Sequence, residues 1–82
     1  MIIDSYYVVT IKDNNDETKY LRYNSTGCIY FDSFRSAYRY NGYDEALNHF
    51  LKNKNNIFSV DSYDLSTIKI AHIEINSTVV ND

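Results

Sequence analysis

Residues 43–52 read YDEALNHFLK, and this stretch decides the expected fold. Its apolar residues recur at the spacing i, i+3, i+4, i+7 and i+8, which places them along one side of an α-helix. They are Tyr43, Ala46, Leu47, Phe50 and Leu51. Carboxylates in the first turn and lysines at the end suit the helix dipole, and Gly42 followed by Glu45 predicts the N-terminal cap. The pattern predicts a helix from Tyr43 to Lys52 that packs its apolar side against a second layer.

The residues before the helix predict a β-hairpin as that second layer. Residues 5–12 (SYYVVTIK) and 18–24 (TKYLRYN) are rich in β-branched and aromatic residues and alternate with a period of two. Between them, residues 13–17 (DNNDE) form a turn, because Asp and Asn side chains hydrogen-bond their own backbone. The alternation places Tyr20 and Arg22 together on one face of the second strand.

Shorter elements are expected between this hairpin and the helix. Residues 28–31 form a short apolar segment. Asp32 or Ser33 then stands where it can cap one helical turn over residues 34–36. Residues 37–41 (AYRYN) alternate and predict a short strand that leads into the helix.

Two further strands are expected after the helix. Residues 57–60 predict a short strand and residues 61–66 a polar loop, and the last strand (TIKIAHIEI) begins at Thr67 and ends at Ile75. Isoleucines fall on both faces of this last strand. Either a bulge near residues 71–72 resets the register, or both faces are covered. A second copy of the chain is one way to cover the second face, so a homodimer through this strand is one hypothesis.

The 82 residues are expected to form a single domain, residues 1–82, with residues 76–82 as a loose tail. The fold class is α+β: a small antiparallel sheet, made of the N-terminal hairpin and further strands, packed on one main amphipathic helix with one short helical turn. The single cysteine, Cys28, excludes an internal disulfide, and with no signal peptide it predicts a reducing cytoplasm. The apolar runs are much shorter than a membrane span, so no membrane association is expected.

Charge is distributed unevenly along the chain, whose formal net charge is −3. Residues 1–17 carry four carboxylates against one lysine, and residues 42–82 carry six carboxylates against three lysines. Residues 18–41 carry four basic side chains against one carboxylate. The acidic balance argues against non-specific DNA binding as the main role. It leaves room for a local basic patch in the middle of the chain.

That basic stretch also holds five of the nine tyrosines. Tyrosine and arginine are enriched at the energetic centres of protein interfaces, so the stretch predicts a binding surface. The residues predicted to contact a partner are Tyr20, Arg22, Arg35, Tyr38, Arg39 and Tyr40. The alternative is that about half of the tyrosines lie in the core, with Tyr38 and Tyr40 directed at the helix. A bias toward AT-rich codons would explain many tyrosines but not the arginines beside them.

No arrangement of residues predicts catalysis. Cys28, His49 and His72 have no acid at a diagnostic spacing, and an i, i+4 pair with Glu45 accounts for His49. One cysteine and two histidines are too few for a structural zinc site. Residues 13–17 resemble a calcium loop only in composition, since the central glycine and distal glutamate are missing. Neither enzyme activity, nor a metal, nor a cofactor is expected.

The middle of the chain resembles a pattern found in short phage and prophage proteins. Residues 31–51 (FDSFRSAYRYNGYDEALNHFL) carry most of it: an alanine-aromatic segment at 37–41 and a helix that opens Tyr-Asp-Glu-Ala at 43–46. A hairpin with the Tyr-Leu pair at 20–21 precedes them, and an Ile-rich closing strand at 67–75 follows. The resemblance implies a class of accessory proteins that includes anti-CRISPR inhibitors. It implies no functional residues, because the shared positions are structural.

Three hypotheses of function follow. The first is a non-catalytic phage-type inhibitor that blocks a host protein, such as a CRISPR-associated nuclease, through its Tyr/Arg surface with acidic rims. The second is a nucleic-acid-binding accessory protein that uses the basic, aromatic stretch at residues 18–41. The third is the structural homodimer through the closing strand. If the protein is phage-encoded, it is expected in the cytoplasm of the host cell.

Overall fold

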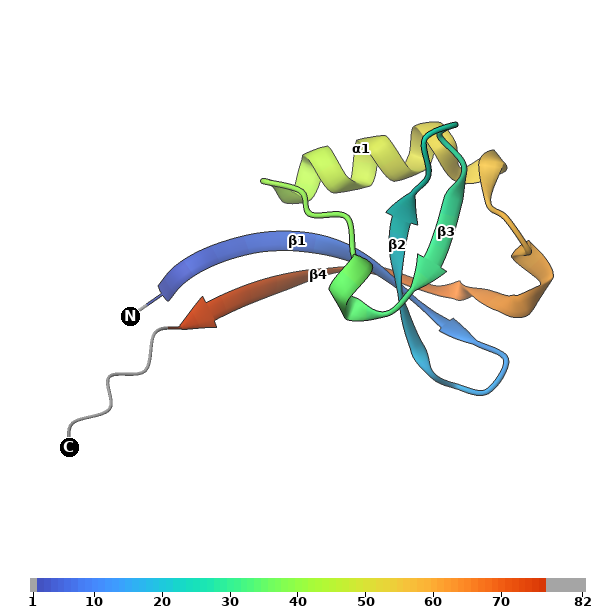
Figure 1. Ribbon diagram of the computed structural model, residues 1–82, viewed down its shortest axis with the longest axis horizontal. Helices are drawn as coiled ribbons and strands as arrows, with labels where there is room; N and C mark the ends of the chain where they lie inside the picture. The colour runs from blue at the N-terminus through green and yellow to red at the C-terminus, as the bar shows by residue number, and fades with distance from the viewer. Residues whose placement is uncertain (1, 77–82) are drawn as a thin grey trace.

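The computed structural model describes residues 2–76 and has an α+β fold, as predicted (Figure 1). Four antiparallel strands form one sheet in the order β3-β2-β1-β4. The strands are β1 (Ile2–Asp13), β2 (Thr18–Tyr23), β3 (Ile29–Asp32) and β4 (Tyr63–Asn76). The helix α1 (Tyr43–Asn53) lies across one face of this sheet. We call the face toward α1 the inner face and the opposite one the outer face.

The predicted hairpin and its turn are confirmed. The Asp13 carboxylate accepts hydrogen bonds from the backbone N–H groups of Asn15 and Glu17, each at 2.9 Å. Asp16 adopts a φ of +63°, a left-handed conformation that Asp tolerates better than most residues. The side chain of the first turn residue, Asp13, therefore stabilises the turn. Next to the turn, β1 pairs with β2 from Lys12↔Thr18 to Thr10↔Tyr20.

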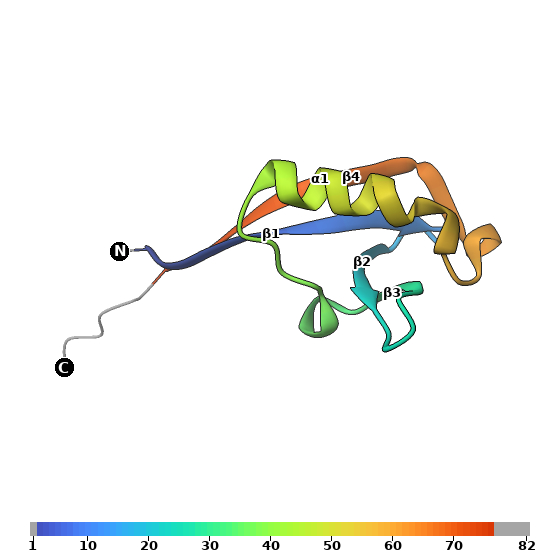
Figure 2. The same cartoon turned by 90° about the horizontal axis from the view of Figure 1, so that it is seen from above.

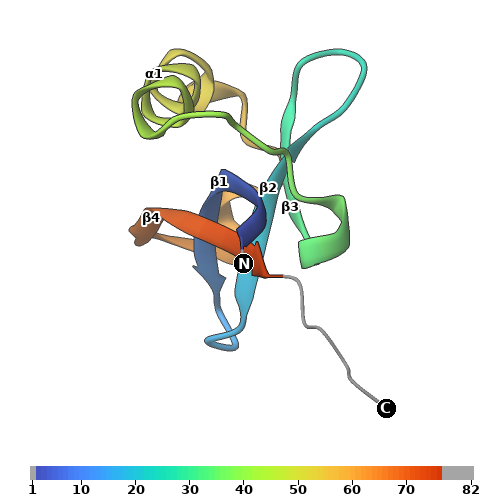
Figure 3. The same cartoon turned by 90° about the vertical axis from the view of Figure 1, so that its left-hand side faces the viewer.

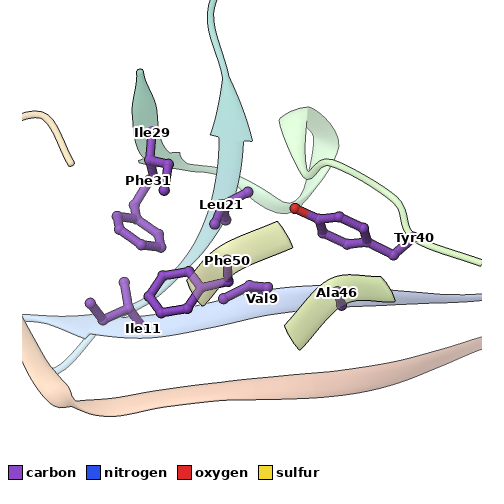
Figure 4. Close-up of a cluster of buried hydrophobic side chains, with 8 residues drawn as sticks. All are labelled: Val9, Ile11, Leu21, Ile29, Phe31, Tyr40, Ala46 and Phe50. Carbon is purple, nitrogen blue, oxygen red and sulfur yellow. The ribbon is translucent and has the colours of Figure 1, made fainter. Parts of the chain in front are cut away.

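The predicted helix is confirmed, and it covers the core of the protein. Gly42 is its extended N-cap residue, and the Glu45 carboxylate accepts a hydrogen bond from the Asn41 N–H at 3.3 Å. From its apolar stripe, Ala46 and Phe50 are buried against the inner face. The core cluster consists of Val9, Ile11, Leu21, Ile29, Phe31, Tyr40, Ala46 and Phe50 (Figure 4).

Strand β4 is longer than predicted, and its irregularity lies elsewhere. No bulge occurs near residues 71–72, because Tyr7 pairs regularly with His72 and Val8 with Ala71. The register shifts instead between the pairs Thr10↔Lys69 and Lys12↔Asp64. From Lys69 to Ile75 the pairing is regular and places isoleucines on both faces, and a second shift lies between the pairs Asp4↔Ile75 and Ile2↔Asn76. The other predicted possibility was that both faces are covered, and Ile75 on the outer face is 36% exposed in the single chain. Figures 1 and 2 show the far ends of β1 and β4 leaving the body as a two-stranded ribbon.

The prediction of a strand at residues 37–41 is wrong. The N–H of Tyr38 donates to the Leu21 carbonyl of β2, whereas Tyr40 exchanges two 2.8 Å hydrogen bonds with Tyr7 of β1. Because the segment bonds two different strands within three residues, it crosses the sheet instead of running alongside one strand. Only an isolated bridge forms, between Tyr7 and Tyr40.

The segments flanking the helix also differ in part from the predictions. The helical turn Phe34–Ser36 forms as predicted, but Ser33 makes no capping bond and the Asp32 carboxylate only accepts a bond from the Ser33 N–H. The predicted strand at residues 57–60 is wrong: it is reduced to a bridge at Ile57, because Ser59 turns the chain with a φ of +54°.

The predicted loop and tail are shorter than expected. The structure has the 3-10 turns Lys54–Asn56 and Val60–Ser62 after the helix. Strand β4 begins at Tyr63, inside the loop predicted for residues 61–66, because it continues past the register shift to pair with Lys12 and Asp13. Asn76, predicted as tail, pairs with Ile2 and ends β4. The rest of the predicted tail, residues 77–82, lies outside the described residues.

Candidate functional site

The outer face of β2 and β3 carries four polar or aromatic side chains. Tyr20 and Arg22 alternate with the buried Leu21, so they point away from α1. Their cross-strand partners Asp32 and Tyr30 share that face, because paired residues of antiparallel strands lie side by side. The register of the β2-β3 hairpin therefore assembles this group.

The turn at Phe34–Ser36 extends the group along the outer face. Phe34 packs edge-to-face on Tyr20, with ring centroids 5.2 Å apart, and it remains exposed. Arg35 follows it and is exposed as well. Arg39 lies with its guanidinium 4.4 Å from the centre of the Tyr6 ring. Figure 3 shows this turn, in green, on the side of the sheet away from α1.

We define the Arg-aromatic surface as these outward residues together. Its members are Tyr20, Arg22, Tyr30, Phe34, Arg35 and Arg39. Phe58 borders it and stacks on Tyr30 with centroids 5.0 Å apart. Four of the six residues predicted to contact a partner thus lie on the outer side of the sheet: Tyr20, Arg22, Arg35 and Arg39, the last beside Tyr6 of β1. Tyr30 and Phe34 were missed. If residues 28–31 had been recognised as a strand that pairs with residues 18–24, the pairing would have placed Tyr30 beside Arg22.

The arginines of this surface are positioned but only loosely paired. Arg22 lies 5.6 Å from the centre of the Tyr30 ring, and its Nε is 3.8 Å from the Asp32 carboxylate. Arg39 is 3.9 Å from the Asp4 carboxylate. Both separations exceed hydrogen-bond length, so the pairs are Coulombic contacts at an exposed surface. The Tyr30 and Tyr6 rings position the guanidinium groups of Arg22 and Arg39. The Nε of Arg22 is buried without a hydrogen-bond partner among the described residues, so the donors that Arg22 can offer to a partner are those of its terminal nitrogens.

The two remaining predicted contact residues lie on the inner side. Tyr40 is 1% exposed and belongs to the core, so we leave it out of the contact surface. Tyr38 is 44% exposed, but its ring packs against Tyr23, Tyr40 and His49. Tyr38 and Tyr40 lie two residues apart but differ in burial, because the segment enters the core only at Tyr40, where it hydrogen-bonds β1.

Tyr40 is the centre of a hydrogen-bonded cluster beneath α1. Its hydroxyl donates to the Tyr23 hydroxyl at 3.1 Å and lies 2.9 Å from Nδ1 of His49. His49 therefore pairs with Tyr40, and the predicted solvated pair with Glu45 is wrong. Burial raises the pKa of Tyr40 well above its ordinary value, and burial likewise raises the pKa of Tyr23. Both phenols stay protonated in the folded protein at neutral pH.

Replacing Tyr40 by Phe is expected to lower the free energy of unfolding by about 1–2 kcal/mol, because two hydrogen-bonded neighbours lose their partner. Urea denaturation at pH 7 measures the change. Tyr38→Phe is the matched control, since the structure gives its hydroxyl no hydrogen bond to a described residue. Equal stability of wild type and Tyr40→Phe would contradict a stabilising role for this cluster.

Alkaline pH is expected to destabilise the protein through the same cluster. Below the ordinary tyrosine pKa of 10.0 both the folded and the unfolded chain keep the phenol protons, so the contribution to stability is complete. Above that pH the unfolded chain loses protons that folded Tyr40 retains, and stability falls. Unfolding curves at pH 8 to 11 should show a shallower loss in Tyr40→Phe. If stability falls equally steeply with pH in wild type and in Tyr40→Phe, Tyr40 is excluded as the source of the alkaline destabilisation.

The residues considered for catalysis or metal binding are not assembled into a site. Cys28 lies in the β2-β3 loop beside Thr26, while His49 contacts the tyrosine cluster and His72 contacts Ser5 and Glu74. Within residues 2–76, no group of three His, Cys, Asp or Glu side chains is placed to hold a metal ion. In the same part of the chain, no helix has the length and apolarity needed to cross a bilayer.

A shallow polar hollow lies beside the first turn. It is lined by Asp13, Asn14, Asn15, Lys19, Ser62 and Tyr63. The Asp13 carboxylate that faces it is already bonded to two backbone N–H groups. This use of the carboxylate within the turn, with a lysine close by, does not suit a calcium loop.

Comparison of the chain with known protein families, curated proteins and solved structures gave no match.

Proposed function

We propose that the protein is a non-catalytic inhibitor that binds and covers a functional surface of a host protein through its Arg-aromatic surface. A CRISPR-associated nuclease is the target class that the resemblance to phage proteins implies. The observation that supports the proposal is the gathering of three arginines and three aromatic rings on one side of the sheet, outside the core.

The chemistry of this surface suits a protein partner. Arginine and tyrosine are the residues that contribute most at protein interfaces, and here several are already held by ring contacts. Ordering them before binding reduces the entropy lost on association. Asp4 and Asp32 lie among the arginines, so the surface offers both charges to a mixed protein surface. A nucleic acid backbone would be repelled by these carboxylates.

A nucleic-acid-binding role is the second candidate, because exposed rings beside arginines on an open sheet can stack bases. The two candidates differ in salt dependence. Phosphate binding weakens steeply as salt rises, since it releases counterions. Binding to a protein through desolvated aromatic and arginine contacts is expected to weaken much less between 50 and 200 mM salt, where a protein with several phosphate contacts loses roughly 1000-fold or more in affinity.

Affinity capture from a bacterial host lysate, with and without nuclease treatment, tests the proposal. We expect one dominant protein that survives nuclease and is lost when the bait carries Arg35→Ala and Arg39→Ala. Mass spectrometry identifies it. Capture that disappears with nuclease would overturn the protein-partner proposal in favour of nucleic acid. If capture survives nuclease but is equal for the wild-type bait and the arginine variant, the Arg-aromatic surface is excluded as the site that binds the captured protein.

A further inference from the structure

Strand β4 has an open edge along its regular part. Among residues 2–76 it is the last strand in the sheet order and pairs with β1 only. Between Lys69 and Ile75 its pairing with β1 has no register shift. Figure 1 shows no other strand or helix of residues 2–76 beside this part of β4, on the side away from β1. The edge lacks the proline and bulge that proteins use to block strand pairing, and it carries one lysine.

The backbone groups at this edge can be assigned from the contacts of Tyr7. Both the N–H and the C=O of Tyr7 bond to Tyr40, on the side away from β4. The pair Tyr7↔His72 is therefore the non-hydrogen-bonded type, in which both residues direct their backbone groups away from each other. His72 thus points its N–H and C=O to the open edge. By the two-residue period, so do Ile70 and Glu74.

We propose that this edge pairs antiparallel with the same edge of a second copy, about a two-fold axis at His72. In that register His72 faces His72 of the second copy, and Ile70 faces Glu74 of the second copy in both directions. All three outward residues of each copy then have hydrogen-bonding partners. His72 is the midpoint of the open segment from Lys69 to Ile75, and the outward backbone groups of Ile70 and Glu74 lie at equal distances on either side of it. The proposed register therefore pairs every outward N–H and C=O of this regular segment.

Side chains at the edge favour antiparallel pairing of two copies over parallel pairing. Antiparallel pairing sets the Lys69 end of one β4 beside the Glu74 end of the other, whereas parallel pairing would set lysine beside lysine. On the outer face, Ala71 would face Ile73 of the second copy. Ile75, 36% exposed in the single chain, would be covered by the aliphatic stem of the opposite Lys69. The same isoleucines that fall on the outer face of β4 thereby gain a cover.

The dimer has a geometric consequence for binding. A two-fold axis perpendicular to a continuous sheet keeps each outer face on the same side. Both copies would therefore present their Arg-aromatic surfaces in one direction, to a two-fold or repeated partner surface. This consequence rests on the proposed function, whereas the dimer itself does not.

Disulfide trapping tests the pairing and its register. In a Cys28→Ser background, His72→Cys places two thiols at the two-fold axis, where paired Cα atoms lie about 5.5 Å apart, within the range of a disulfide. Mild oxidation should give a covalent dimer on non-reducing gels at micromolar protein concentration. Asn48→Cys, exposed on α1, is the control and should stay monomeric. If His72→Cys gives no more covalent dimer than this control, the proposed dimer is overturned. If Ala71→Cys forms the covalent dimer and His72→Cys does not, the proposed register is overturned.

Light scattering on the Cys-free variant and on wild type gives the second readout. We expect twice the chain mass of 9.6 kDa at 100 µM, roughly the concentration at which weak edge pairing is populated. Glu74→Pro removes only an outward N–H, so the fold should persist by circular dichroism while the mass falls to one chain. A wild-type monomer at this concentration, or a dimer unaffected by Glu74→Pro, overturns the proposal. None of these readouts involves the partner, so failure of the dimer and failure of the proposed function are distinguishable.

Discussion

Phe50→Ala is expected to lower the free energy of unfolding by about 3–5 kcal/mol, a large part of the total stability, roughly 5–10 kcal/mol, of a domain of this size. Phe50 is 8% exposed and projects from α1 into the cluster formed by Val9, Leu21 and Phe31. Removing the ring leaves a cavity at the only place where the helix enters this cluster with a large side chain. The surrounding side chains are held by the hydrogen-bonded strands β1, β2 and β3, so they can fill the cavity only partly.

Leu51→Ala is the matched control for this prediction. Leu51 follows Phe50 on the same helix and belongs to the same apolar stripe, but it is 48% exposed. Its truncation is expected to change stability by less than about 1 kcal/mol. Urea denaturation followed by circular dichroism measures both variants. Similar losses for the two would contradict the orientation of α1 on the sheet.

The double variant Arg35→Ala and Arg39→Ala is expected to weaken partner binding by roughly 1–4 kcal/mol, about 5- to 1000-fold in Kd. Both side chains are exposed on the Arg-aromatic surface, and neither enters the core. The contacts of Arg39 with Tyr6 and Asp4 are worth on the order of 1 kcal/mol to the fold. The variant should therefore stay folded while binding is lost. Calorimetry with the captured partner measures the effect.

Lys52→Ala with Lys54→Ala is the control for charge. It removes the same two positive charges from exposed positions at the end of α1, away from the outer face. Its affinity should equal that of wild type. If the lysine variant weakens binding as much as the arginine variant, the effect is one of net charge. If neither variant changes affinity, the contact surface lies elsewhere on the protein.

Local patterns in the sequence were sufficient for the main elements. The period of the apolar residues predicted the helix because the stripe from Tyr43 to Leu51 needs no distant partner to be recognised. The polar turn at residues 13–17 predicted the hairpin because its stabilising hydrogen bonds come from Asp13 within the turn itself. The α+β class follows from these two elements and the closing strand.

The failed predictions concern segments whose structure depends on distant residues. Residues 37–41 alternate like a strand, yet they bond β2 at Tyr38 and β1 at Tyr40, which local alternation does not reveal. The bulge near residues 71–72, one of the two alternatives for the isoleucine pattern, is absent, and the register of β4 shifts before Lys69 and after Ile75 instead. In both cases the sequence shows which side chains are apolar but not which neighbouring strand they meet.

The candidate surface divides in the same way. Sequence alone identified the stretch rich in tyrosine and arginine, and strand alternation put Tyr20 and Arg22 on one face. Tertiary structure decided that Tyr30 and Phe34 join them and that Tyr40 enters the core, because pairing register and chain crossing determine which faces meet. The sequence by itself determined the types of elements, since these depend on local periodicity. Only the packed chain decided which side chains remain on the surface, since burial depends on contacts between residues far apart in the sequence.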